Sequence, residues 1–547
     1  MDLHTLPEKN ANVYGQGHLR HNTRRSTPAW RTVGLLVLCA FGVRELVHKV
    51  SHTWMSRFRV NGLAYSGENI RWTPCGEVNN HEVECSTIRV PMDQFSTTNS
   101  GDQVFNIPLF RLRGNNAKES ILLNPGGPGA SGYEFVFNYG KELQDIVGED
   151  FHLLSFDPRG VNSSTPLASC YPDEETRQQL GTVRKSDAIR DSPELYAWST
   201  NFVRACRDSL GEHGKYLNTP QTAADMNSIL EAIGQRDMLY WGFSYGTTLG
   251  QVYATLYPEK SKRILIDGVA DQRGWFEEQL DSTMFIDTDT VHAGFYDECV
   301  KAGKACPLSK HGKTGPELAD KVATTINKLR NSPLSVYIDT HTHGILDDSK
   351  LWNDGIFREL YTPKTWPRLA SSLAELLEGN ATSAFLNYGR GDLFHPQGEA
   401  FRVIALNDAA TGPEHWPQER KELLRLLLPW FDQHRFATAS PQLTYYLKQQ
   451  WDMPKSHEYK PVQHVETAHP LLILSMTYDP VCPLKAAEIA AKMFEGSRIV
   501  EVQGYGHCSL AMPSACAAKH IRAYFSHGTM PEEGVKCEIN AEYFPSA

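Results

Sequence analysis

The sequence predicts an α/β protein in which a mostly parallel sheet is covered by helices on both faces and interrupted late by a helical insertion. Short apolar runs that end in turn residues predict strands at 104–112, 120–125, 151–158, 238–243, 263–268, 470–476 and 498–504. Helical patterns lie between several of them; in 222–234, four apolar residues recur at helical spacing and Gly234 can cap the helix. Near-continuous apolar strands that alternate with helices are typical of a parallel sheet buried on both faces.

The alternation of strands and helices stops between about residues 271 and 455. This stretch predicts helices and loops with few candidate strands, and the strand pattern resumes at 470. An insertion at this place usually covers the strand ends where a site lies. We therefore divide the chain into an N-terminal segment, a first core part, a cap and a second core part, which span 1–52, 70–270, 271–455 and 456–547.

Composition and charge exclude one class of function. The 547 residues suffice for one large domain with an insertion or for several ordinary domains. The formal net charge is −10, and no basic stripe offsets it. General electrostatic attraction to nucleic acid is therefore not expected, and we predict no nucleic-acid partner.

The N-terminal segment combines a basic tail with a short apolar run. Residues 1–32 hold five basic and two acidic residues, and VGLLVLCAFGV follows at 33–43. This run suits the central region of a secretion signal better than a full membrane span, which needs about 20 residues. Because no small-x-small cleavage site follows, an uncleaved signal anchor that holds the protein at the membrane is an equal alternative. A short buried N-terminal helix of a soluble protein is the third.

The cysteines favour an oxidising compartment. One of the 11 lies in the apolar run, and the other ten, an even number, favour disulfide bonds. Zinc is the competing explanation, but no C-x-x-C or H-x-x-x-H array accompanies them, so no metal is expected. Glycosylation sequons begin at Asn162 and Asn380. Together these features predict the secretory pathway, with the folded part outside the cytosol, either extracellular or membrane-anchored.

The segment GFSYG at 242–246 is a candidate nucleophile elbow. It follows an apolar strand and precedes a helical pattern, and an elbow there would project the Ser244 hydroxyl from a strained turn. The two glycines would leave room for so sharp a turn. An ordinary glycine-rich turn is the alternative, and the pentapeptide alone does not decide between them.

A serine nucleophile needs a histidine base and a carboxylate that orients the base. Asp479 and His507 each begin or occupy a loop after a predicted strand, where catalytic groups of parallel sheets gather. Asp267, at the end of another strand, is the second candidate for the acid. The alternative to a catalytic role for Asp479 is a purely structural one, in which its side chain forms an Asx turn before proline. His520 and His527 are weaker candidates for the base, because they fall on or after the final amphipathic helix.

A developing oxyanion needs backbone N–H donors close to the nucleophile. The first is expected from Tyr245, and the second from Gly126 or Gly127 in the loop NPGGPG after an early strand. Glycines let a backbone approach a ligand closely because no Cβ intervenes. The loop lacks the lysine and Ser/Thr of a P-loop and the spacing of G-x-G-x-x-G, so no nucleotide and no other cofactor is expected.

Five separated motifs resemble those of one enzyme family. They are GGPG at 126–129, DPRG at 157–160, the stretch from GFSYG to GVAD at 242–271, DPVCP at 479–483 and GYGHCS at 504–509. Between about 70 and 545 the sequence resembles the secreted tripeptidyl aminopeptidase group of the α/β-hydrolase superfamily, which is related to prolyl aminopeptidases. The motifs agree with that group in both type and order.

The resemblance implies an α/β-hydrolase fold, with a helical cap inserted after the strand that ends at Asp267. It assigns the catalytic triad to Ser244, Asp479 and His507, in agreement with the choice made from the residues. It also implies four disulfide bonds, which are Cys75–Cys85, Cys170–Cys206, Cys299–Cys306 and Cys516–Cys537.

Two departures from the family pattern affect the site and the cap. The family loop after the acid usually reads DPVTP, but this chain has Cys482 in place of the threonine. Cys508 directly follows the candidate base His507, so we predict a Cys482–Cys508 disulfide that joins the loop of the acid to the loop of the base. The family cap is expected to carry a cysteine in an AIxCxD motif, whereas this chain has ALND at 405–408. Knowledge of family substrates therefore transfers least well to the cap.

The expected activity is that of a serine hydrolase which works through an acyl-enzyme and releases short peptides or residues from a free N-terminus. Binding the amine would require carboxylates under the cap, where Glu277, Glu278 and Asp281 lie, although a solvated acidic helix face is the commoner account of such residues. An esterase or amidase acting on a small metabolite would use the same triad and is the alternative. A noncatalytic interaction protein with a hydrolase fold is a remote alternative, because it would be expected to lose a triad member.

Overall fold

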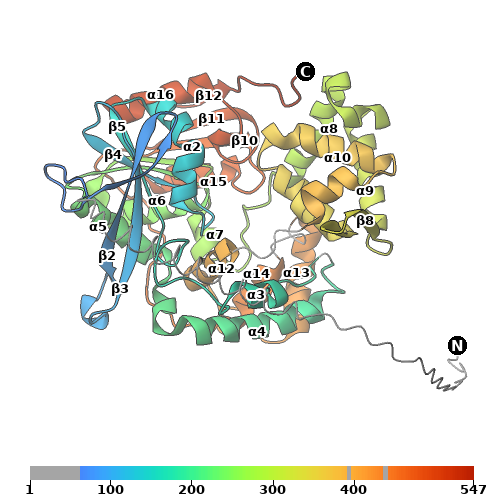
Figure 1. Ribbon diagram of the computed structural model, residues 1–547, viewed down its shortest axis with the longest axis horizontal. Helices are drawn as coiled ribbons and strands as arrows, with labels where there is room; N and C mark the ends of the chain where they lie inside the picture. The colour runs from blue at the N-terminus through green and yellow to red at the C-terminus, as the bar shows by residue number, and fades with distance from the viewer. Residues whose placement is uncertain (1–61, 186, 391–395, 435, 437–441, 547) are drawn as a thin grey trace, which may run out of the picture. The chain divides into compact units, whose positions relative to one another are not determined.

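The computed structural model describes residues 62–185, 187–390, 396–434, 436 and 442–546, which include a ten-stranded sheet whose strands lie on the left and at the top of Figure 1. The strand order is β1-β2-β3-β5-β4-β6-β7-β10-β11-β12. These strands are β1 (Thr73–Val78), β2 (His81–Pro91), β3 (Val104–Leu112), β4 (Glu119–Asn124), β5 (Phe151–Phe156), β6 (Met238–Phe243), β7 (Ser261–Asp267), β10 (Leu472–Tyr478), β11 (Arg498–Tyr505) and β12 (Val535–Glu538).

The sheet is mostly parallel, as predicted. Neighbouring strands from β5 to β12 in this order pair in parallel, and β1, β2, β3 and β5 pair antiparallel at the other end. Every strand predicted from the sequence lies in the sheet. Strands β1, β2 and β12 were not predicted, because β1 exposes most of its residues, β2 mixes buried and exposed positions, and β12 has only four residues.

Helices cover both faces of this sheet. Helices α2 (Gly132–Val147) and α16 (Ala515–His527) pack against each other, and so do α5 (Thr219–Ala232) and α6 (Tyr245–Leu256). Helix α15 (Leu484–Met493) packs on β10 and β11. All six residues of the central strand β6 are buried, which requires cover on both sides. The α/β class predicted from the alternation of strands and helices is confirmed.

Between β7 and β10 the chain leaves the sheet and forms the mainly helical cap. A short hairpin of β8 and β9 in this region was not predicted from the sequence, because both strands are short and each has only one buried residue. The elements are α7 (Gln272–Phe276), α8 (Thr288–Ala302), α9 (Gly315–Lys328), β8 (Leu334–Asp339), β9 (Thr342–Leu346), α10 (Trp366–Leu377), α11 (Thr382–Ala384), α12 (Pro396–Asp408), α13 (Arg420–Gln433) and α14 (Gln442–Gln450).

Two helices between β5 and β6 lie beside the cap. They are α3 (Glu174–Leu180) and α4 (Ser192–Leu210), and α4 packs against α13 and α14 (Figure 1). The hydroxyl of Tyr446 on α14 lies 2.9 Å from that of Ser192 on α4. The sequence division placed this part of the chain in the core, and α4 packs against helices of the cap as well as against the core segment 211–216.

Four disulfides join the pairs that the resemblance implies, which are Cys75–Cys85, Cys170–Cys206, Cys299–Cys306 and Cys516–Cys537. The predicted Cys482–Cys508 bridge is not present, since both residues are buried free thiols. The Cys508 sulfur packs against Gly268, where an added Cβ would lie 2.5 Å from it. Cys482 instead lies beside Asp479, so each thiol is packed against a different neighbour.

The membrane prediction concerns residues that the structure does not describe. The basic tail and the apolar run at 33–43 lie outside the described residues. Within the described part of the chain, no helix is both long enough and apolar enough to cross a membrane. Anchoring through the N-terminal segment therefore stays a prediction.

Candidate active site

Strand β6 ends in a sharp turn that carries Ser244 into helix α6. Ser244 has φ 56° and ψ −126°, a strained conformation for a non-glycine residue. A Cβ on Gly242 would lie 2.3 Å from the carbonyl oxygen of Gly246, and one on Gly246 would lie 2.6 Å from that of Asn124. The N–H of Ser244 donates to the carbonyl oxygen of Asp267 at 3.0 Å. The segment is therefore a strand–turn–helix elbow that only glycines permit, rather than an ordinary turn.

Asp479 lies just after β10 and is fully buried. Its Oδ1 accepts the N–H groups of Val481 at 3.0 Å and Cys482 at 2.8 Å, and its Oδ2 accepts that of Cys508 at 3.1 Å. The Asx turn that the sequence offered as an alternative is thus present. It fixes the carboxylate, and both oxygens also face His507.

His507 follows β11 and contacts the carboxylate directly. Its Nδ1 lies 2.9 Å from Oδ2 and 3.0 Å from Oδ1 of Asp479. The backbone N–H of His507 donates to the carbonyl oxygen of Tyr361 at 2.8 Å. The Tyr361 ring packs edge to face against the imidazole, with 5.1 Å between the ring centroids. The Nε2 atom is buried and has no hydrogen-bond partner within the described residues. His520 and His527 lie on α16, not on this loop.

The residues after His507 attach its loop to the nucleophile turn. The buried Cys508 thiol lies against the backbone of Ser244. Ser509 donates its N–H, at 2.8 Å, and its hydroxyl to the carboxylate of Asp267. Burial raises the pKa of Asp267 to about 6. Asp267 therefore holds the histidine loop in place, whereas Asp479 is the carboxylate that accepts the imidazole hydrogen bond.

The loop after β4 packs against the elbow through Gly126. Its φ is 92°, and an added Cβ would lie 2.9 Å from the Cβ of Ser244 and 3.0 Å from the nitrogen of Tyr245, so only glycine permits this approach. The N–H of Gly126 is engaged with Oδ1 of Asn124 at 3.0 Å. Tyr245 begins α6, where N–H groups lack helical partners. The N–H groups of Tyr245 and Gly127 are the remaining candidate donors.

The three acidic residues at the start of the cap lie beyond the end of α7 and do not form a helix face. Glu277 is exposed, and Glu278 accepts a backbone N–H at 3.0 Å within the turn that follows. Asp281 is half-buried, and its Oδ1 accepts the N–H and hydroxyl of Thr283 at 3.0 and 2.8 Å. Burial raises the pKa of Asp281, and its charge acts on Cys482. Of the three, Asp281 is therefore the one whose charge acts on the Asp479 loop, and the charge of Lys448 acts on Asp281 in turn.

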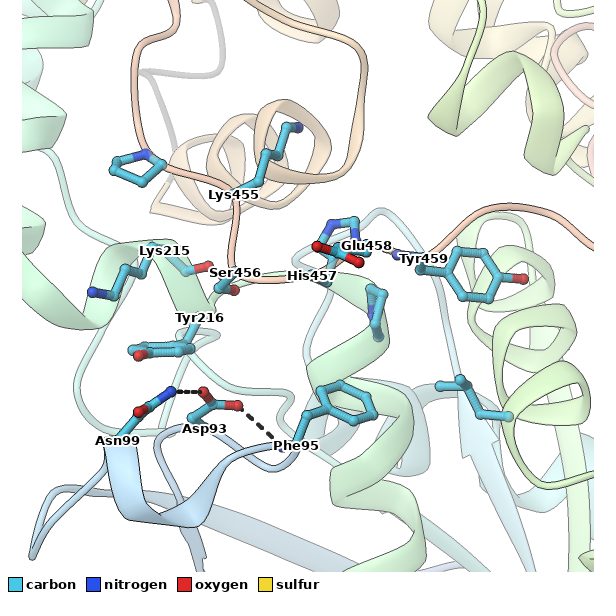
Figure 2. Close-up of a pocket in the computed structure, with 13 residues that line it drawn as sticks. Asp93, Phe95, Asn99, Lys215, Tyr216, Lys455, Ser456, His457, Glu458 and Tyr459 are labelled. Atoms are coloured by element: carbon cyan, nitrogen blue, oxygen red, sulfur yellow. Dashed lines mark hydrogen bonds between the residues drawn. The ribbon is translucent and has the colours of Figure 1, made fainter.

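A cavity of about 770 Å³ lies elsewhere, where the segment 454–459 passes from the cap back to the core (Figure 2). Neither Ser244 nor its neighbours line it. Two of its polar groups are already engaged, and the first is Asp93, which accepts the side-chain amide of Asn99 and the N–H of Phe95, both at 3.0 Å (Figure 2). The ammonium of Lys455 donates to three carbonyl oxygens at the end of α12. We therefore do not assign this cavity to the site.

The two sequon asparagines are both exposed. The amide of Asn162 donates to Oδ2 of Asp157 at 2.9 Å and to the Ser131 hydroxyl at 3.0 Å. That of Asn380 donates to Glu375 at 2.9 Å. The Asn162 amide also donates to the Ser163 hydroxyl at 3.3 Å, so a glycan on Asn162 would disturb more hydrogen bonds than one on Asn380.

Family models match the two parts of the chain that carry these residues. Residues 119–297, which include Ser244, match the alpha/beta hydrolase fold, and residues 439–537, which include Asp479 and His507, match the TAP-like protein family. The chain therefore has the alpha/beta hydrolase fold, its C-terminal region is similar to the TAP-like protein family, and both matches support a hydrolase.

The chain is also similar to curated proteins over most of its length. Serine protease Hip1 of Mycobacterium tuberculosis (strain ATCC 25618 / H37Rv) is 28% identical over 494 residues, which cover 86% of this chain and 91% of that protein. Tripeptidyl aminopeptidase of Streptomyces lividans is 25% identical over 566 residues, which cover 95% of this chain and 99% of that protein. Carboxylesterase B of Mycobacterium tuberculosis (strain CDC 1551 / Oshkosh) is 25% identical over 495 residues, covering 85% and 89%.

Proposed function

We propose that the chain is a serine hydrolase in which Ser244 is the nucleophile, His507 the general base and Asp479 the carboxylate that orients the base. The observation that carries this proposal is the 2.9 Å contact between Nδ1 of His507 and the buried Asp479. The same loop touches the strained elbow through Cys508. An imidazole that donates Nδ1–H to a carboxylate presents the lone pair of Nε2 as a base.

The proposed reaction passes through an acyl-enzyme. Nε2 of His507 takes the hydroxyl proton of Ser244 as Oγ attacks the acyl carbon, and Asp479 stabilises the imidazolium that forms. The N–H groups of Tyr245 and Gly127 stabilise the tetrahedral oxyanion. The leaving group then takes the proton from His507. A water molecule, activated by the same nitrogen, releases the acyl group and restores Ser244.

We further propose that the substrate is a peptide with a free N-terminus. Two of the relatives are named as a serine protease and a tripeptidyl aminopeptidase, which supports peptide bonds as the substrate class. Asp281, whose charge acts on Cys482 in the Asp479 loop, would bind the amine. The four disulfides support folding in an oxidising compartment, and we propose a location outside the cytosol.

The test is a matched substrate panel. It compares aminoacyl and tripeptidyl amides with a free N-terminus, the same peptides with an acetylated N-terminus, and simple acyl esters, with Ser244→Ala as the background. Preferential cleavage of the unblocked peptides supports the proposal. Equal cleavage of blocked peptides, or activity confined to the esters, would favour an esterase or amidase, the alternative that Carboxylesterase B among the relatives suggests.

We expect Asp281→Asn to raise the KM for unblocked peptide amides about 10- to 100-fold, because a hydrogen bond to a charged group contributes about 1.5–3 kcal/mol. Its effect on kcat is expected to be small, since the amine does not react. Steady-state kinetics on a peptide amide and on an acyl ester without an amine separate the two effects. The exposed Glu277→Gln is the matched control. An equal rise in KM for both substrates would show that Asp281 does not bind the amine of the peptide.

We expect Asp479→Asn and Asp267→Asn to differ in their effect on kcat. The first removes the charge that faces Nδ1 of His507 and should lower kcat by about 10⁴-fold, as loss of the orienting carboxylate does in other triads. The second leaves an acceptor oxygen for Ser509 and should lower kcat by less than about tenfold, because only a distant charge is lost. If Asp267→Asn proved the more damaging, the roles of the two carboxylates would have to be exchanged.

A further inference from the structure

Three side chains of metal-ligating type meet inside the proposed triad. Within the described residues, ligand atoms of Asp479, Cys482 and His507 all lie within 4.8 Å of one another. Asp479 and Cys482 are buried, and the side chain of His507 is 10% exposed. The other set of this kind, on α16 and β12, has both its cysteines in a disulfide and cannot bind an ion through them.

The donor set is a carboxylate oxygen, a thiol sulfur and an imidazole nitrogen. These are the three kinds of ligand that zinc accepts in proteins, and the thiolate selects against hard cations such as Mg²⁺ and Ca²⁺. In a tetrahedral zinc site, donors at about 2.0–2.3 Å from the ion lie about 3.4–3.6 Å from one another. Nδ1 of His507 and Oδ2 of Asp479, which now lie 2.9 Å apart, would therefore have to separate by about 0.5 Å, and the Cys482 sulfur would have to approach them by at most about 1.4 Å.

We infer that Asp479, Cys482 and His507 form an inhibitory site for a thiophilic divalent cation such as Zn²⁺. Binding itself needs only the three ligands, whereas inhibition rests on the proposed function, in which two of them do the chemistry. The cation lies between the carboxylate and Nδ1, where the hydrogen bond now runs, and the sulfur is its third protein ligand.

Inhibition follows from where the protons go. The Cys482 thiol releases one proton to solvent when its sulfur binds the cation. The imidazole keeps its single proton, but with the cation on Nδ1 that proton has to lie on Nε2. An Nε2–H group cannot accept the hydroxyl proton of Ser244, so the nucleophile is not activated. Removal of the cation returns the proton to Nδ1 and restores the base.

Cys508 provides a matched control for Cys482. Both thiols are free and buried on loops that flank the proposed triad. The Cys508 sulfur packs against Gly268 and the backbone of Ser244, and Cys508 does not belong to the three-residue set. Cys482→Thr replaces the thiol with a hydroxyl of similar size, which is a poor zinc ligand. Cys482→Ser is a second variant in case threonine does not fit.

The binding test uses cobalt and zinc on chelator-treated full-length protein. We expect one Co²⁺ per chain and a cobalt–thiolate charge-transfer band in the near ultraviolet, displaced by Zn²⁺. Cys482→Thr should lose the band and bind Zn²⁺ about 100-fold or more weakly by calorimetry, since even changes behind a ligand cost 10–100-fold. Cys508→Ser should keep both the charge-transfer band and the wild-type affinity for Zn²⁺. Absence of the band in the wild type, or its survival in folded Cys482→Thr and Cys482→Ser, overturns the inference.

The activity test compares each variant with its own rate in the absence of metal. Zn²⁺ should inhibit the wild type and Cys508→Ser, and a chelator should reverse the inhibition. Cys482→Thr should need about 100-fold more Zn²⁺. Equal inhibition of Cys482→Thr and wild type overturns the inhibitory site. A thiolate band in a chain that hydrolyses no substrate would instead support the cation site and contradict the proposed function, so the two failures are distinguishable.

Discussion

Replacing Ser244 with alanine is expected to lower kcat by about 10⁴- to 10⁶-fold, because no other group at the elbow can form the acyl-enzyme. The change should leave the fold intact. The backbone bond from residue 244 to Asp267 does not use the side chain, and alanine adds no atom where the elbow meets Gly126. The measurement is kcat on the best unblocked peptide of the panel, together with labelling by a fluorophosphonate that reacts with activated serines.

A double variant tests whether the proposed triad acts as a unit. His507→Gln should also reduce kcat by several orders of magnitude, because the hydroxyl of Ser244 loses its base. Ser244→Ala combined with His507→Gln should then be about as slow as either single variant, since residues of one catalytic unit are strongly non-additive. Losses that multiply in the double variant, or normal labelling of Ser244→Ala, would contradict the assignment of Ser244.

The sequence predicted the parts of this fold that depend on local patterns. Each apolar run between turn residues became a strand of the sheet, because a strand buried on both faces must be apolar throughout. The elbow was one of two conformations that the pentapeptide allowed, the other being an ordinary glycine-rich turn. The strained φ of Ser244 decides in favour of the elbow.

The features that the sequence did not predict depend on contacts between distant segments. Tyr361 holds His507 with its carbonyl oxygen and its ring, but nothing around residue 361 indicates that the cap returns to the site there. The two free thiols are a second case. Their positions beside the acid and the base suggested a bridge, but packing directs Cys508 toward Gly268 and the elbow. The exposed hairpin of β8 and β9 lacks the apolar pattern that marks a buried strand.

Replacing Arg159 with methionine is expected to lower the free energy of unfolding by about 3–5 kcal/mol, because it leaves a buried charge without its partner. Arg159 and Asp225 are both fully buried. The guanidinium donates to the two carboxylate oxygens at 2.7 and 2.6 Å, and also to the carbonyl oxygens of Met92 and Tyr216 at 2.8 and 3.1 Å. Loss of the guanidinium also removes a hydrogen-bond donor from each of the two carbonyl groups, which lowers the free energy of unfolding further.

A double variant separates two contributions to the free energy of unfolding, which are the penalty for an unpaired buried charge and the net stabilisation by the ion pair. Arg159→Met combined with Asp225→Leu removes both charges, and it should be more stable than Arg159→Met alone, since apolar replacement of a whole buried pair is often close to neutral. The control is Lys262→Met, which breaks a partly exposed 3.0 Å pair with Glu119 and should cost at most about 1 kcal/mol. Urea unfolding of the oxidised protein gives the midpoints and slopes. If Arg159→Met cost no more than Lys262→Met, water would have to reach Asp225 and replace the guanidinium, and Arg159 would not anchor the DPRG loop to helix α5.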